Sequence, residues 1–144
     1  MELVTMGKVT VEAKIENLSD LYAASRGFLP EAEIRSIVTY SAVVDTGATT
    51  LAIPKHLIAQ LGLRHVRTKR GRTPVGLFDF RIFEAVRLTV QGRQCVVEVS
   101  ETHEETPVLI GQLPLESLDF LVDPVNQRLI GNPDHNGEDM IDLF

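Results

Sequence analysis

The chain is 144 residues long, which suits a single domain with enough length to bury a hydrophobic core. Its apolar fraction of 44% and charged fraction of 24% are those of an ordinary globular protein, and no apolar run approaches the roughly 20 residues that a membrane-spanning helix needs. The formal net charge of −6 disfavours a general nucleic-acid-binding protein, so we expect neither a membrane nor a nucleic acid as partner.

The N-terminal third contains one clear strand and one segment without a clear pattern. The start of the chain lacks the basic and long apolar regions of a secretory signal, so we expect a cytoplasmic protein. Apolar and polar residues alternate over 6–17, which predicts a strand. Residues 18–33 fit no element. We expect a loop over 26–30, and the next strand could begin at 31–33.

An acid follows directly after a long apolar run. The run Ile37–Val44 predicts a buried strand, and this strand delivers Asp45 into a Thr-Gly turn. Gly47 lets the chain turn sharply and leaves room for another backbone or a substrate. A short helix of about two turns follows, with Pro54 in its first turn and Gly62 as its C-terminal cap.

The next segment is basic and contains no acid. Two interpretations stay open: a solvated loop, or a mobile basic loop that contacts an acidic substrate or a nucleic acid. Few aromatic residues interleave with the charges, which weakens the nucleic-acid interpretation. The turn signal lies at Arg70–Pro74. The basic residues are Arg64, Arg67, Lys69, Arg70 and Arg72.

The middle of the chain predicts several short strands. One covers Val75–Phe83, with Phe78, Phe80 and Ile82 on one face. A hairpin pairs 86–90 with 95–99 around Gln91–Arg93. Cys95 is the only cysteine and cannot form an intrachain disulfide. We interpret it as a small buried strand residue in a reducing compartment.

The last third repeats the pattern of a buried strand followed by a short helix. Residues 107–111 predict a buried strand that ends in Gly, and 114–118 predict a helical turn. A final hairpin turns at Asp123–Asn126, and residues 134–144 form an acidic tail. Many short strands with one or two short helices indicate a mostly-β, closed, barrel-like fold.

Together these features resemble the retropepsin-type aspartic proteases. The resemblance covers about residues 6–133 and implies one retropepsin-like domain over 1–133, followed by the tail over 134–144. It implies that Asp45 is the catalytic acid. The supporting active-site loop is then Thr46, Gly47 and Ala48, and the structural strand that ends in Gly is Leu109, Ile110 and Gly111.

The same resemblance implies a flap near 69–75, a polypeptide substrate and an aspartic endopeptidase activity without cofactor or metal. The four histidines show no metal-ligand spacing, and we interpret them as solvated or capping residues, with His103 and His135 in loops. Because the chain has only one Asp-Thr-Gly loop, the second acid must come from a second copy in a homodimer. The flap residues are Lys69, Arg70, Gly71, Arg72, Thr73, Pro74 and Val75.

Two features depart from the family pattern, and a rival function stays open. Gln112 replaces the charged residue that often follows the second Gly, and residues 18–33 form an insertion. Asp123 also follows an apolar run, but no Gly follows it, so we interpret it as a turn residue. The rival is a non-catalytic peptide-binding or regulatory module on the same fold. An acid at the Asp45 turn favours the enzyme, because a binding module does not need one.

Overall fold

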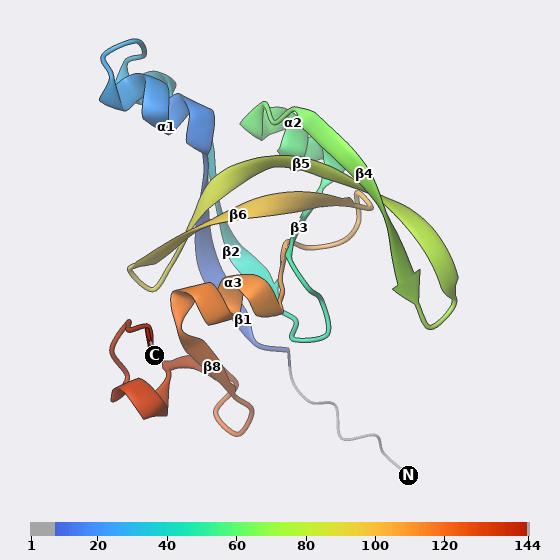
Figure 1. Ribbon diagram of the computed structural model, residues 1–144, viewed down its shortest axis with the longest axis vertical. Coiled ribbons are helices and arrows are strands. Elements are labelled where there is room, and N and C mark those ends of the chain that lie inside the picture. Colours follow the sequence, from blue (N-terminus) through green and yellow to red (C-terminus); the bar gives the residue numbers. More distant parts are fainter. Residues whose placement is uncertain (1–7, 144) are drawn as a thin grey trace.

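The computed structural model describes residues 8–143 and shows a mostly-β protein with three short α-helices (Figure 1). The mostly-β prediction is confirmed, although it allowed for only two helices. The strands are β1 (Thr10–Asn17), β2 (Ser36–Val44), β3 (Leu51–Pro54), β4 (His65–Thr73), β5 (Gly76–Val90), β6 (Arg93–Thr102), β7 (Leu109–Ile110), β8 (Phe120–Asp123) and β9 (Arg128–Gly131). The helices are α1 (Leu18–Ser25), α2 (Lys55–Leu61) and α3 (Gln112–Leu118), with 3₁₀ turns at Glu31–Glu33 and Pro133–His135.

One sheet closes on itself and forms the body of the molecule. Its strand order is β1-β2-β7-β3-β6-β5-β4, and β1 pairs a second time with β5. The sheet is therefore ring-like, with β4 outside the ring, paired to β5 alone. β8 and β9 form a separate hairpin, which pairs Phe120 with Gly131. It lies near the C-terminal end of the chain, beyond α3 (Figure 1).

The core fills the inside of this ring. Inward-facing side chains of six strands are fully buried, and α2 and α3 add Leu61 and Leu118 to the same cluster. Each buried Leu or Ile side chain contributes about 1.5–3 kcal/mol to the free energy of folding. The fully buried aliphatic side chains include Ile15, Leu51, Ile53, Val86, Leu88, Val99 and Ile110.

The unassigned segment contains a helix that sequence patterns do not reveal. Asp20 is the only buried residue of α1, so no fully buried apolar side chain anchors this helix. Asn17 starts the helix: its side-chain oxygen accepts a hydrogen bond from Asp20 N at 2.9 Å, and its amide nitrogen donates to Leu61 O at 2.8 Å. Arg35 binds the Asp20 carboxylate through Nε at 2.8 Å. This hydrogen bond lowers the pKa of Asp20.

Two strand predictions differ from the structure in detail. Residues 31–33 form a 3₁₀ turn, so β2 begins only at Ser36. β2 covers the predicted strand Ile37–Val44, but the prediction that this strand is buried is wrong. Tyr40 is 76% exposed and Val38 is 47% exposed, because no element within residues 8–143 covers their face of the strand. The predicted strand over 6–17 is found as β1, and its first two residues lie outside the described residues.

The segment after β9 folds back onto the end of α3 through a buried histidine. His135 is 9% exposed, which contradicts its interpretation as a solvated or capping loop histidine. Its Nδ1 lies 2.6 Å from Asp119 Oδ2, and its Nε2 lies 2.9 Å from Asp142 Oδ2. Met140 N donates to the same Asp119 oxygen at 3.1 Å. A domain boundary at 133 stays a prediction.

This buried cluster predicts a pH-dependent stability. The hydrogen bonds with Asp142 and Asp119 raise the pKa of His135 to about 9, and the hydrogen bond with His135 lowers the pKa of Asp119. A raised histidine pKa stabilises the fold fully below the unfolded value of about 6.5, and this contribution is lost as the pH rises through 9. The lowered pKa of Asp119 adds stability above its unfolded value of about 3.9. The cluster is therefore most stabilising between these two unfolded values.

We expect the free energy of unfolding to fall between about pH 6.5 and pH 9 in the wild type, and to fall less in His135→Gln. Urea unfolding followed by circular dichroism at both pH values measures this difference. His103→Gln replaces a histidine in an exposed loop and should keep the wild-type dependence. Equal pH dependence in wild type and His135→Gln would contradict the assignment.

Candidate active site

The Asp45 loop is attached to the end of a strand that is held between two others. β7 pairs in parallel with β2, where Val44 lies opposite Ile110, and antiparallel with β3, where Leu51 lies opposite Ile110. β7 thus lies between the strand that enters the loop and the strand that leaves it. Asp45 N donates to Ile110 O at 2.9 Å, which continues the ladder to the acid itself.

Within the loop, the backbone fixes the Asp45 carboxylate. Gly47 N donates to Asp45 Oδ1 at 2.9 Å, and Ala48 N donates to Asp45 O at 3.1 Å. A Cβ on Gly47 would lie 3.2 Å from Asp45 Oδ1, which is tighter than an ordinary contact. Asp45 and Ala48 are half-buried, whereas Thr46 and Gly47 are exposed. The acid is therefore held in one orientation with the exposed part of the loop beside it.

The start of α3 holds the second half of the loop. Three successive backbone N–H groups donate to loop carbonyls: Gln112 N to Ala48 O at 2.9 Å, Leu113 N to Thr49 O at 2.9 Å, and Gly111 N to Thr50 O at 3.0 Å. The first N–H groups of a helix have no acceptor within the helix, so the loop carbonyls supply the acceptors that the start of α3 lacks. The departure at Gln112 does not disturb this contact, which uses only its backbone. Its side chain instead donates to Glu116 Oε1 at 3.1 Å.

Gly111 is required at this junction because the loop carbonyls occupy the place of a side chain. A Cβ there would lie 2.5 Å from Thr50 O and 2.7 Å from Ala48 O. Both atoms belong to the backbone and cannot move without moving the loop. The strand that ends in Gly is thus the support of the acid loop.

The predicted flap region forms the end of a long hairpin. The basic segment, for which a loop was expected, is strand β4, and its pairing with β5 runs from His65↔Phe83 to Thr73↔Gly76. The turn is therefore at Pro74 and Val75, and it overlaps the predicted turn over 70–74 only at Pro74. The Phe80 ring lies over Gly71, in the space that a side chain at this position would occupy. The hairpin projects from the ring as a separate arm in Figure 1.

A cleft of about 560 Å³ lies between this hairpin and the acid loop. It brings Gly47, Ala48 and Leu109 together with the predicted flap residues 69–73. Asp45, Thr46, Pro74, Val75, Ile110 and Gly111 do not line it. Sequence analysis missed several lining residues, although the alternation in β5 placed Phe80 and Ile82 on one face. The others include Thr50, Ala52, Glu98, Val99, Ser100 and Leu113.

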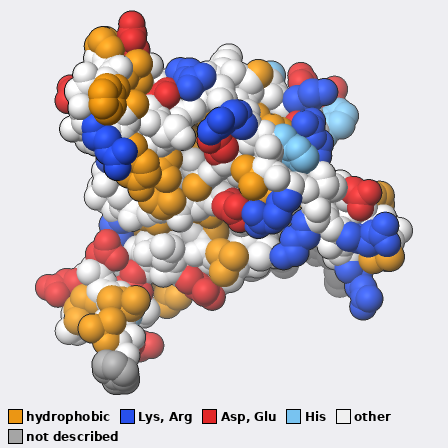
Figure 2. All heavy atoms as spheres, turned by 45° about the horizontal axis from the view of Figure 1, so that its top comes forward, with side chains coloured by type: hydrophobic (Ala, Val, Ile, Leu, Met, Phe, Trp, Pro, Cys, Tyr) orange, Lys and Arg blue, Asp and Glu red, His pale blue; other side chains and the backbone are white. Residues whose placement is uncertain are grey.

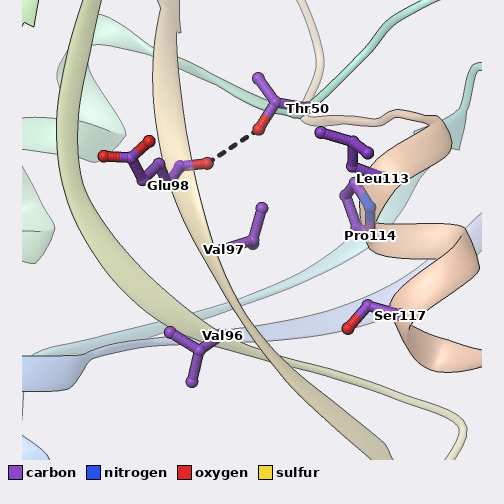
Figure 3. A pocket seen from close by; sticks show the side chains of 7 residues that line it. All are labelled: Thr50, Val96, Val97, Glu98, Leu113, Pro114 and Ser117. Atoms are coloured by element: carbon purple, nitrogen blue, oxygen red, sulfur yellow. Dashed lines mark hydrogen bonds between the residues drawn. The ribbon is translucent and has the colours of Figure 1, made fainter. Parts of the chain in front are cut away.

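A second hollow of about 280 Å³ adjoins the cleft between β6 and α3. Figure 3 shows Val97, Leu113 and Pro114 around it, with the hydrogen bond from Thr50 Oγ1 to Glu98 O at 3.0 Å along one side. Thr50, Glu98 and Leu113 line both hollows. The acid loop therefore borders a charged cleft on one side and a mostly apolar hollow on the other.

Other reactive groups of the chain lie in structural roles. Burial raises the pKa of the Cys95 thiol, which therefore stays protonated at neutral pH, as expected for a buried strand residue. Asp123 accepts hydrogen bonds from Val125 N at 3.1 Å and Asn126 Nδ2 at 2.8 Å, in keeping with its interpretation as a turn residue. Within residues 8–143, no three His, Cys, Asp or Glu side chains are grouped so that they could hold a metal ion. No helix in that range is long and apolar enough to cross a membrane.

Comparison with known proteins agrees with this geometry. The sequence model of a protein family described as aspartyl protease matches residues 31–113. This span covers more than half of the chain and contains β2, the acid loop, the β4–β5 hairpin and β7. A search of curated proteins finds no match.

We expect Gly111→Ala to disturb the acid loop and to lower the free energy of unfolding by about 2 kcal/mol, because the new methyl group collides with two backbone carbonyls. Chemical denaturation measures the loss, and amide NMR shifts of 45–50 report the loop. Gly92→Ala is the control: it lies in the β5–β6 turn with positive φ and open space around it. It should cost stability without shifting the loop amides. Unchanged loop amides in Gly111→Ala would contradict the assigned support.

Proposed function

Because this chain belongs to the aspartyl protease family, we propose that it is an aspartic endopeptidase whose active centre forms where two copies meet. The observation that carries the proposal is the rigidly held Asp45 carboxylate beside a cleft with a hairpin over it. Each chain supplies one such acid loop, and aspartic protease chemistry requires two carboxylates. A homodimer supplies the second. The exposed part of the loop, Thr46 and Gly47, would then face its symmetry mate.

Two Asp45 carboxyl groups at a two-fold axis would share one proton, because two like charges a few ångströms apart are costly to ionise together. This sharing is the established behaviour of aspartic protease dyads. The ionised carboxylate takes a proton from a water molecule, whose oxygen bonds to the peptide carbonyl carbon. The protonated carboxyl gives its proton to the carbonyl oxygen. The tetrahedral intermediate then breaks at the C–N bond: the amine leaves with a proton from one carboxyl of the dyad, and a hydroxyl group of the intermediate gives its proton to the other carboxylate.

The substrate is proposed to lie extended in the cleft beneath the β4–β5 hairpin. β4 is the last strand of the sheet and has one free edge, which suits backbone pairing with an extended peptide. Movement of the hairpin towards the loop would exclude water and align the peptide carbonyl with the dyad. A lone buried Cys95 suits a reducing compartment, which supports a cytoplasmic location.

We expect Asp45→Asn to lower the cleavage rate of an unstructured protein by on the order of a thousandfold or more, because the amide can neither accept the water proton nor share one. Asp123→Asn, in the β8–β9 turn, should keep the activity. Circular dichroism establishes that both variants are folded. Peptide binding without cleavage in the wild type and in Asp45→Asn alike would instead support the non-catalytic module.

We also expect the specific activity to fall on dilution, because each chain holds half of the active centre. Sedimentation velocity over the same concentrations should show the dimer dissociating where activity is lost. A specific activity that stays constant while the protein sediments as a monomer would exclude the two-chain site.

A further inference from the structure

The cleft is strongly cationic although the whole chain is acidic. Four Lys and Arg residues of β4 line it, and Glu98 is the one carboxylate among its lining residues. The chain as a whole carries a formal net charge of −6. Figure 2 shows Lys and Arg side chains gathered along the hairpin side of the molecule. A positively charged cleft in a chain of negative net charge indicates a ligand that carries negative charge. The lining cations are Arg67, Lys69, Arg70 and Arg72.

Only some of these cations are neutralised within the chain. Arg67 binds Glu98 through two hydrogen bonds of 2.7 and 2.6 Å. Arg70 has a longer and exposed contact with Asp79 at 3.6 Å. Among the residues that the structure describes, no carboxylate lies within 4.0 Å of the cationic groups of Lys69 or Arg72. Neither charge is therefore neutralised by a described carboxylate. Arg72 lies on the opposite face of β4 from Arg67 and Lys69, because successive side chains of a strand point to opposite faces.

The position of Lys69 makes it the best placed of the two. Its cross-strand partner is Phe80, and that of Arg67 is Ile82, so the two cations and these two apolar side chains share one face of the hairpin. All four line the cleft. The hydrogen bond with Arg67 lowers the pKa of Glu98, and the positive charges of Arg67 and Lys69 add to this effect.

We infer that the cleft selects extended peptides that carry Asp or Glu side chains facing β4, with Lys69 as the specificity-determining residue. One acidic side chain would pair with Lys69, and a second could replace Glu98 at Arg67. A peptide fits better than a nucleic acid because the remaining lining is largely apolar, with Ile82, Val99 and Leu109. The inference rests on the proposed function, since it names the substrate class of the same site.

Binding measured without cleavage tests this inference separately from the protease activity. In the Asp45→Asn background, two labelled peptides of equal length are compared by fluorescence anisotropy. They differ only in two Glu residues against two Gln residues. We expect the Glu peptide to bind at least about threefold more tightly at low salt, and the ratio to shrink at high salt as exposed charges are screened.

The variant Lys69→Gln should bring the ratio close to one. The matched control, Lys55→Gln, removes the same charge from an exposed position at α2 and should keep the ratio. Four results would overturn the inference: equal binding of both peptides, binding of neither, a loss of preference in the control, or tighter binding of a labelled oligonucleotide through Lys69. A retained Glu preference in a wild-type protein that cleaves nothing would refute only the protease proposal.

Discussion

Three backbone hydrogen bonds from the start of α3 to the carbonyls of 48–50 hold the acid loop, and the rest of the site depends on them. They satisfy two needs at once. The first N–H groups of a helix require acceptors, and a loop that leaves a sheet requires donors. Gly111 allows the two segments to approach this closely, since a Cβ would collide with two of the carbonyl oxygens. The acid is thus positioned by backbone geometry, which explains why the change to Gln112 leaves the support intact.

The parts of the fold that follow from simple periodicity were predictable. The strands around Gln91 and Gly92 were identified because their alternation matches a sheet with one buried face and because a Gly lies in the turn between them. In the structure both turn residues have positive φ. The acid loop was identified from an apolar run, an acid and a Gly. Strand β4 was not, because its residues are almost all charged or polar and it pairs on one side only. A strand of this kind has no sequence pattern that separates it from a loop.

Features that depend on contacts between distant residues could not be predicted from the sequence. α1 has no fully buried apolar side chain and is held by Asn17 and by the Asp20–Arg35 pair, whose members lie 15 residues apart. His135 is buried only because Asp119 and Asp142 surround it. In the site, Glu98 faces the cleft because the register of β6 brings it to Arg67. Such contacts follow from the three-dimensional arrangement, and no local signal indicates them.

The central claim is that one acid per chain works with its twin in a second chain. Mixing wild-type chains with a ninefold excess of Asp45→Asn chains, under conditions that allow the subunits to exchange, tests this most directly. If both carboxylates are required, only pairs of wild-type chains are active, and the activity per wild-type chain should fall to about one tenth. An activity per wild-type chain that stays unchanged after exchange would contradict the account.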